Sequence, residues 1–172
     1  MDIQVAVLCD AATDNNGKLN ILGTFDTIYT ARLPETHPQC SIAIRMTFNK
    51  VEEGAHKVKL NFGDEDGKPV MPPIEMPVEV LVPEETIFLS RNIIVNIQKL
   101  RFEKEGLYSI NIAVDGRQEG SIPLLVKIAP KLGGGSRGQE LSWRPAAQGQ
   151  VAESAAWVRH SASAGLGAGC HR

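Results

Sequence analysis

Several acidic residues are clustered in one turn-forming stretch of the sequence. Asp64, Glu65 and Asp66 are consecutive and are followed by Gly67. Carboxylate oxygens at flexible loop ends are the ligands that calcium prefers, so Asp64 and Asp66 are candidate metal ligands. The spacing lacks the later acidic ligand of an EF-hand loop, and Asp and Gly are equally what a tight turn needs. A loop-end calcium site and an ordinary turn both remain open.

A metal-dependent hydrolase would need more carboxylates than the Asp64 turn provides, and other predicted loops contain them. Asp10, Asp14 and Asp115 follow or separate apolar runs. A small metal-dependent hydrolase would need them to converge with Asp64 and Asp66 in one pocket, whereas ordinary turns would hold them apart.

Two cysteines and two histidines make up a second set of potential ligands. Cys9, His37, Cys40 and His56 match the composition of a Cys2His2 zinc site, but its paired short spacings are absent. Each cysteine also alternates with apolar neighbours, which predicts that both thiols are small core residues. No Gly-x-Ser-x-Gly elbow, phosphate loop or dinucleotide fingerprint is present. The sequence therefore favours a non-catalytic protein, and it predicts no catalytic residue and no cofactor.

A set of polar residues lies on or beside predicted strands and has two interpretations. Amide side chains are suited to hydrogen-bonding a sugar or a peptide, so the set is a candidate recognition face. The alternative, which we favour, is the solvated outer face of an antiparallel sheet. The residues are Arg91, Asn92, Asn96, Gln98 and Asn111.

Composition narrows the class of protein. The chain of 172 residues is 42% hydrophobic and 22% charged, with a net charge of −2. No cluster of Lys and Arg suits a nucleic acid, and no run approaches the length of a membrane span. The N-terminus lacks the basic start and long apolar run of a secretory signal. We therefore expect a cytoplasmic protein without a nucleic-acid or membrane partner, and three cysteines do not form a disulfide framework.

Regular alternation of apolar and polar residues predicts an all-β fold of about eight strands. The clearest strand is 39–48, and residues 102–128 form a hairpin around Asp115-Gly116. Tyr108 near the start of that hairpin resembles a tyrosine corner. Stacking two sheets is the simplest way to bury one face of each strand, so we predict an antiparallel β-sandwich, immunoglobulin-like or a related Greek key, with a barrel as the alternative.

The remaining segments carry more detailed expectations. The first strand places Ile3, Val5, Val7 and Cys9 on the core face. Residues 11–18 form a turn, Gly23 is a bulge, and 32–38 is a loop. Strands at 86–89 and 93–97 are interrupted by 90–92. Prolines between 69 and 83 predict that 78–82 is an edge strand, which leaves the opposite edge available for pairing.

The composition changes abruptly near residue 131. Residues 131–172 are rich in Gly, Ala and Ser, whereas every Phe and Tyr lies before them. We therefore predict a sandwich domain at 1–130 and a mostly disordered tail at 131–172.

Several runs in residues 1–130 resemble a family of short bacterial proteins catalogued only as a domain of unknown function. They include V-L-C-D-A-A-T-D, H-P-Q-C-S-I-A-I-R, D-E-D-G-K-P and N-I-Q-K-L-R-F-E-K-E-G-L-Y-S-I-N-I-A-V-D-G-R. The resemblance implies a compact all-β cytosolic protein and supplies no catalytic or binding residues.

Our leading hypothesis from the sequence is a non-catalytic binding or structural module. It would act through an edge strand or a loop surface, with a protein partner or by self-association. The alternatives are a metal-dependent hydrolase or calcium-binding module that uses Asp64 and Asp66, and a subunit of a phage or secretion particle.

Overall fold

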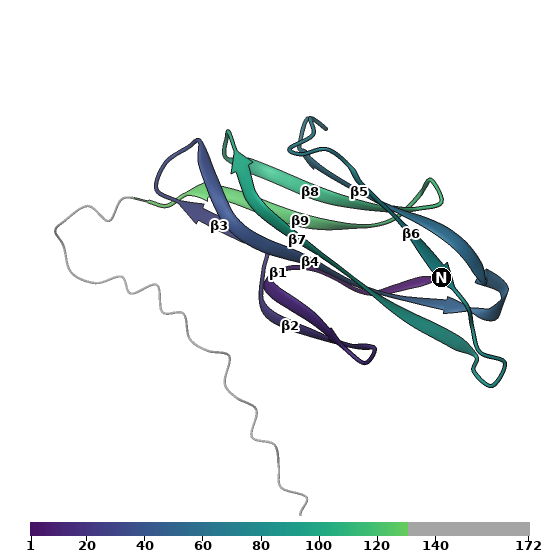
Figure 1. Ribbon diagram of the computed structural model, residues 1–172. Coiled ribbons are helices and arrows are strands. Elements are labelled where there is room, and N and C mark those ends of the chain that lie inside the picture. The colour runs from purple at the N-terminus through teal and green to yellow at the C-terminus, as the bar shows by residue number, and fades with distance from the viewer. Residues whose placement is uncertain (131–172) are drawn as a thin grey trace, which may run out of the picture. The chain divides into compact units, whose positions relative to one another are not determined.

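The structure is a computed structural model that describes residues 1–130. These residues form nine strands and one short 3-10 helix, without an α-helix (Figure 1). The all-β class is therefore confirmed, while the predicted disordered tail lies outside the described residues. The elements are β1 (Asp2–Asn15), β2 (Lys18–Phe25), β3 (Thr27–Thr30), β4 (Glu35–Asn49), η1 (Lys50–Glu52), β5 (Gly54–Asp64), β6 (Ile74–Val80), β7 (Phe88–Phe102), β8 (Gly106–Val114) and β9 (Arg117–Ile128).

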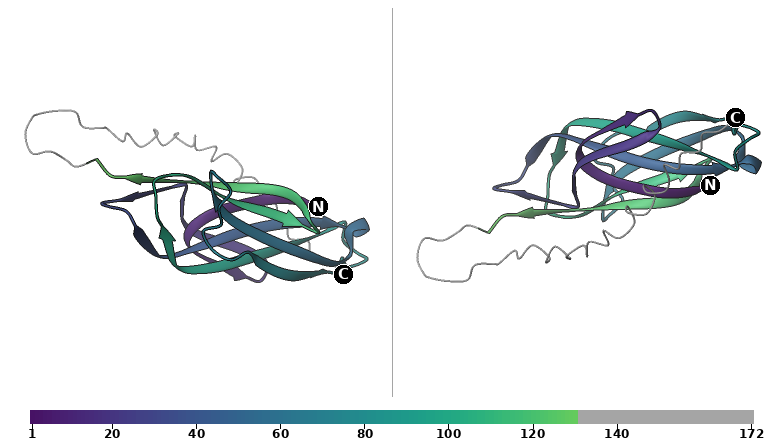
Figure 2. Two further views of the ribbon diagram at one scale, coloured as in Figure 1. Left: turned by 90° about the horizontal axis from the view of Figure 1, so that it is seen from above. Right: turned by 90° about the horizontal axis from the view of Figure 1, so that it is seen from below.

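The strands form two sheets that lie face to face (Figures 1 and 2). Sheet A has the strand order β2-β1-β4-β7, and sheet B has the order β3-β9-β8-β5-β6. Neighbouring strands are antiparallel except β3 and β9, which are parallel. Two stacked sheets are a β-sandwich, so the predicted sandwich is confirmed in preference to the barrel. No helix within residues 1–130 is long and apolar enough to cross a membrane.

The core fills the space between the two sheets. In β4 the predicted alternation is confirmed, because Ile42, Ile44, Met46 and Phe48 are at most 1% exposed. They pack against the inner side chains of sheet B in one cluster. Burial of each large apolar side chain contributes about 1.5–3 kcal/mol, so this cluster is the main source of stability.

The predicted hairpin is formed by β8 and β9. Asp115 and Gly116 connect them with φ of 51° and 82°, the left-handed pair that a two-residue turn requires. The Tyr108 hydroxyl donates a hydrogen bond of 2.7 Å to the carbonyl of Lys104. This is the backbone contact expected from the tyrosine-corner pattern.

The first strand differs from the prediction because its pairing with β4 shifts register between Ile3 and Val5. Ala6 and Leu8 therefore contact the core. Cys9 lies on the other face of the sheet, opposite Ser41. The expectation that Val5, Val7 and Cys9 face the core was wrong, since an irregularity of this kind exchanges the two faces of a strand.

The predicted turn at 11–18 is much shorter than expected. β1 continues to Asn15, and only Asn16 and Gly17 separate it from β2. Beyond Cys9, β1 pairs with β2 alone, and this hairpin folds back below β4 and β7 (Figure 1). At its tip the Gly17 carbonyl accepts a hydrogen bond of 2.8 Å from Arg45. The fold-back explains why Ala43, on the outer face of sheet A, is 0% exposed.

Gly23 does not form the predicted bulge. The register of β1 and β2 is unbroken on both sides of it, and its φ is +64°. The carboxylate of Asp10 occupies the space that a Cβ at this position would need. Glycine therefore permits both the backbone conformation and the close approach of Asp10.

The β4–β7 pair is longer than predicted at both ends. β4 begins at Glu35, inside the expected loop, and β7 runs without interruption through residues 90–92. Pro38 and Lys99 are skipped in the ladder, and Lys99 has φ +55°. Ile97 is buried before this point and Leu100 after it, so the core-facing parity changes there. Because Pro38 and Lys99 are skipped at the same level of the ladder, β4 and β7 bend together there. We call this bend the coupled kink, and it turns the ends of both strands toward sheet B (Figure 1).

The expected edge strand near 78–82 is confirmed as β6, which lies at one end of sheet B and, within the described residues, pairs only with β5.

Candidate functional site

The acidic turn at Asp64 is occupied by hydrogen bonds and by a lysine. Asp64 Oδ1 accepts the backbone N–H groups of Asp66 at 3.1 Å and Lys68 at 2.9 Å. Lys104 Nζ lies 3.3 Å from Asp64 Oδ2 and 2.8 Å from Asp66 Oδ2. Burial raises the pKa of the Asp64 carboxyl, but the Lys68 amide and Lys104 lower it by more, and the net shift is downward. The turn is therefore a capped, ion-paired loop that also anchors the segment after β7.

The other loop acids have separate hydrogen-bond partners. Asp14 accepts hydrogen bonds from Asn92 at 2.6 Å and from the Gly17 amide at 2.8 Å. Asp115 accepts one from the Lys57 amide at 2.8 Å and lies 2.7 Å from His56 Nδ1. These contacts lower the pKa of both carboxyls. The acids thus stabilise different turns instead of converging, and residues 1–130 contain no group of three or more His, Cys, Asp or Glu arranged to hold a metal ion.

The four residues of the predicted zinc set occupy different environments. Cys40 belongs to the core, whereas the Cys9 thiol donates a hydrogen bond to the Ser41 carbonyl at the outer face of sheet A. Burial raises the pKa of the Cys40 thiol to about 11, and it also raises that of Cys9. Neither thiol is therefore activated as a thiolate by its surroundings. His56 bridges Asp115 and the Glu52 carbonyl through its two ring nitrogens.

The predicted polar face is divided between the two sheets. Asn111 is on β8 in sheet B, and the other four residues are on β7 in sheet A. Asn92 binds Asp14 and Arg45, and Asn96 accepts a hydrogen bond of 2.7 Å from Ser41. These two amides hold the β1–β2 hairpin and neighbouring strands in place, so the set does not form one recognition surface.

One edge of sheet A is formed by a continuous strand, β7, where the sequence predicted two strands at 86–89 and 93–97. Within residues 1–130, β7 lies at the end of sheet A, is 15 residues long and pairs only with β4. It contains no proline, unlike β6 and its flanks, which hold prolines at 69, 72, 73, 77 and 83. An edge strand presents a row of unpaired N–H and C=O groups, and proline is one of the devices that protect such edges. The expected interruption at 90–92 concealed this strand, although its run of Ile93, Ile94 and Val95 was a signal for it.

Exposed apolar residues gather beside the start of this edge. Val51 is 93% exposed, Leu81 62%, Ile87 84% and Phe88 54%. Asn49, next to η1, pairs with Phe88, and Lys50 Nζ donates a hydrogen bond of 2.7 Å to the Val82 carbonyl. These contacts bring η1, the 81–87 segment and the start of β7 together. We call Val51, Leu81, Ile87 and Phe88 the apolar corner.

A family model described as a family of unknown function, DUF6941, matches residues 4–127. The chain belongs to this family. The match covers the strands from β1 almost to the end of β9, and it agrees with the resemblance noted in residues 1–130. Membership of DUF6941 assigns no activity to the chain.

The remaining comparisons add no functional argument for this DUF6941 member. No curated protein matches the chain. A solved structure, a glycosyl hydrolase family 2 member from Bacteroides cellulosilyticus, is similar over 55% of this chain and 14% of its own, with 10% identity and a TM-score of 0.33. The chain therefore spans a small part of that protein's length.

Proposed function

We propose that the chain is a non-catalytic binding module, and that β7 pairs with β7 of a second copy. The unpaired 15-residue β7 edge carries this proposal. Its straight part, from Phe88 to the kink at Lys99, is long enough for a continuous antiparallel ladder. Strand addition at such an edge gains main-chain hydrogen bonds and removes the unpaired groups from water.

The charges beside β7 favour antiparallel pairing of two identical edges. Exposed Glu84 and Glu85 precede the strand, and exposed Lys99 and Arg101 lie near its end. A ladder centred on Ile93 pairs Phe88 with Gln98 of the second copy, and beyond its ends the same register brings Arg101 toward Glu85 and Lys99 toward Ile87. Arg101 also contacts Glu103 of its own chain at 2.8 Å, but both side chains are more than half exposed. Opposite charges at both ends specify orientation more than they add affinity.

The apolar corner extends the same surface. Ile87 and Phe88 belong both to the corner and to the start of the edge, so each copy would cover the other's corner at one end of the ladder. Exposed apolar groups beside an unpaired edge are typical of an interaction site.

The test compares charge-reversal variants of the full chain by native mass spectrometry. We expect wild type to be a dimer. The variants Lys99→Glu/Arg101→Glu and Glu84→Lys/Glu85→Lys should each be mostly monomeric, because positions 85 and 101 of the two copies then carry like charges at both ends of the ladder. Mixing the two variants should restore a dimer that contains one copy of each.

Arg117→Glu/Lys127→Glu reverses two charges on β9 in sheet B, away from β7, and should leave the dimer intact. A monomeric wild type would overturn the proposal. A wild-type dimer that all variants retain would also overturn it, by placing the interface on another surface.

A calcium-binding module or hydrolase that uses Asp64 and Asp66 is the alternative. It requires a cation to displace Lys104, which now contacts both carboxylates. A rise in melting temperature on adding calcium, enhanced by Lys104→Met and abolished by Asp64→Asn, would establish it.

We also propose a reducing compartment such as the cytosol. Cys9 and Cys40 are free and lie on opposite faces of sheet A, which supports a protein that does not depend on a disulfide.

A further inference from the structure

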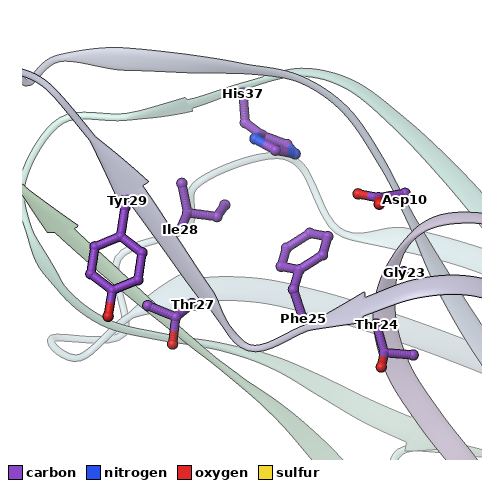
Figure 3. Close-up of a pocket in the computed structure, with 8 residues that line it drawn as sticks. All are labelled: Asp10, Gly23, Thr24, Phe25, Thr27, Ile28, Tyr29 and His37. Atoms are coloured by element: carbon purple, nitrogen blue, oxygen red, sulfur yellow. The ribbon is translucent and has the colours of Figure 1, made fainter. Parts of the chain in front are cut away.

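A pocket of about 360 Å³ opens where β1, β2, β3 and β4 meet (Figure 3). It is separate from the β7 edge, because β7 supplies none of its lining. The bend of β1, the end of β2 and the start of β4 position its side chains. The lining residues are Asp10, Gly23, Thr24, Phe25, Thr27, Ile28, Tyr29 and His37.

Asp10 gives the pocket its charge. It is the only carboxylate of the lining, and it has no hydrogen bond or ion pair with any other residue of 1–130. This distinguishes it from Asp14, Asp64 and Asp115, which are all engaged in turns. The missing side chain at Gly23 leaves the room that the Asp10 carboxylate occupies. An unpaired carboxylate at the side of a pocket attracts a cation.

Aromatic rings provide the other walls. The Phe25 and His37 rings are 5.8 Å apart at 54°. Tyr29 is 66% exposed, and in Figure 3 it lies on the opposite side of the pocket from Asp10, with Phe25 and Ile28 between them. The His37 Nε2 atom is buried and has no hydrogen-bond partner within residues 1–130. Aromatic rings beside a carboxylate favour an organic cation over a strongly hydrated ion.

We infer that this pocket binds the ammonium group of a small organic cation. Asp10 supplies the counter-charge, the neighbouring Phe25 ring supplies cation–π contact, and Tyr29, on the other side of the pocket, supplies contact to the rest of the molecule. Calcium does not fit this donor set, because it requires six or more oxygen ligands and the pocket offers a single carboxylate. The volume is at the small end of ligand pockets, which matches a molecule the size of an amino alcohol.

The experiment uses choline and its uncharged isostere 3,3-dimethylbutan-1-ol as probes. Each is titrated into the ¹⁵N-labelled full chain, and amide shifts are followed at Gly23, Thr24 and His37. We expect choline to shift these amides with saturation and the alcohol to bind at least tenfold more weakly, because the two molecules differ mainly in charge.

Three variants test the roles of the walls. Asp10→Asn should weaken choline binding at least tenfold, and Tyr29→Leu should weaken it severalfold. Asp2→Asn removes an exposed carboxylate at the other end of β1 and should change nothing. Since Asp10 and Tyr29 are exposed, both variants should fold, which an unchanged amide spectrum away from the pocket would verify. Absence of choline binding, equal binding of the alcohol, or full binding by Asp10→Asn would each overturn the inference.

Discussion

At the residue scale, the Tyr108 hydroxyl fixes the segment between β7 and β8. Its ring packs edge-on against Phe62 and Phe102, and its hydroxyl satisfies the Lys104 carbonyl. Tyr108→Phe keeps the ring and leaves that partly buried carbonyl without its donor. We expect a loss of about 1 kcal/mol in the free energy of unfolding, measured by urea denaturation. Tyr29→Phe, at an exposed tyrosine, is the control and should be neutral; equal effects of the two variants would contradict this role.

The Asp64 carboxyl makes stability depend on pH. Its pKa is lower in the folded protein than the value of about 3.9 in an unfolded chain. Asp64 therefore contributes stability above about pH 4, and this contribution is lost as the pH falls through the folded pKa. The difference in unfolding free energy between wild type and Asp64→Asn should shrink between about pH 5 and pH 2. A difference that stays constant over that range would show that the Lys68 amide and Lys104 do not favour the charged carboxylate.

At the element scale, local signals were sufficient where the chain makes its own turns. Asn16-Gly17 and Asp115-Gly116 both form left-handed two-residue connections, as their residue types predict. The faces of β1 could not be predicted, because the irregularity near Val5 depends on pairing with β4, about 40 residues away. Strand β7 was divided wrongly for a similar reason. Asn92 is a polar residue inside a strand, and its partners Asp14 and Arg45 come from other strands.

The coupled kink at Pro38 and Lys99 yields a prediction about backbone strain. Lys99 has φ +55°, a region that costs an ordinary residue about 1 kcal/mol and a β-branched residue more. Lys99→Val should therefore destabilise the fold by about 1–2 kcal/mol, and Lys99→Gly should not. Gln98→Val changes the preceding exposed residue, which has ordinary strand geometry, and should be nearly neutral in thermal denaturation. A tolerated Lys99→Val would show that the backbone at the kink can relax.

At the scale of the whole molecule, the fold could be predicted more completely than the candidate sites. Alternation in 39–48 and 106–128 was sufficient to indicate a sandwich, since a strand with one apolar face needs a partner sheet. Asp64 was recognised as a turn acid, but its pairing with Lys104 joins residues 40 positions apart. The unpaired edge of β7 and the pocket at Asp10 depend on strand order and on the fold-back of β1. Neither is encoded in a local motif.

The core and the strand ladders together predict the consequence of removing residues 131–172. Every residue of the described core cluster lies between Met1 and Val126, and the last backbone hydrogen bond at this end joins the Ala129 amide to the Thr30 carbonyl at 2.8 Å. A chain that stops at residue 130 retains all of these contacts. Its free energy of unfolding should therefore be within about 0.5 kcal/mol of the full chain, by urea denaturation at equal protein concentration. Equal concentration matters because dimerisation through β7 would add concentration-dependent stability to both proteins. A loss of several kcal/mol would show that residues 131–172 cover part of the sandwich and would place the domain boundary after residue 130.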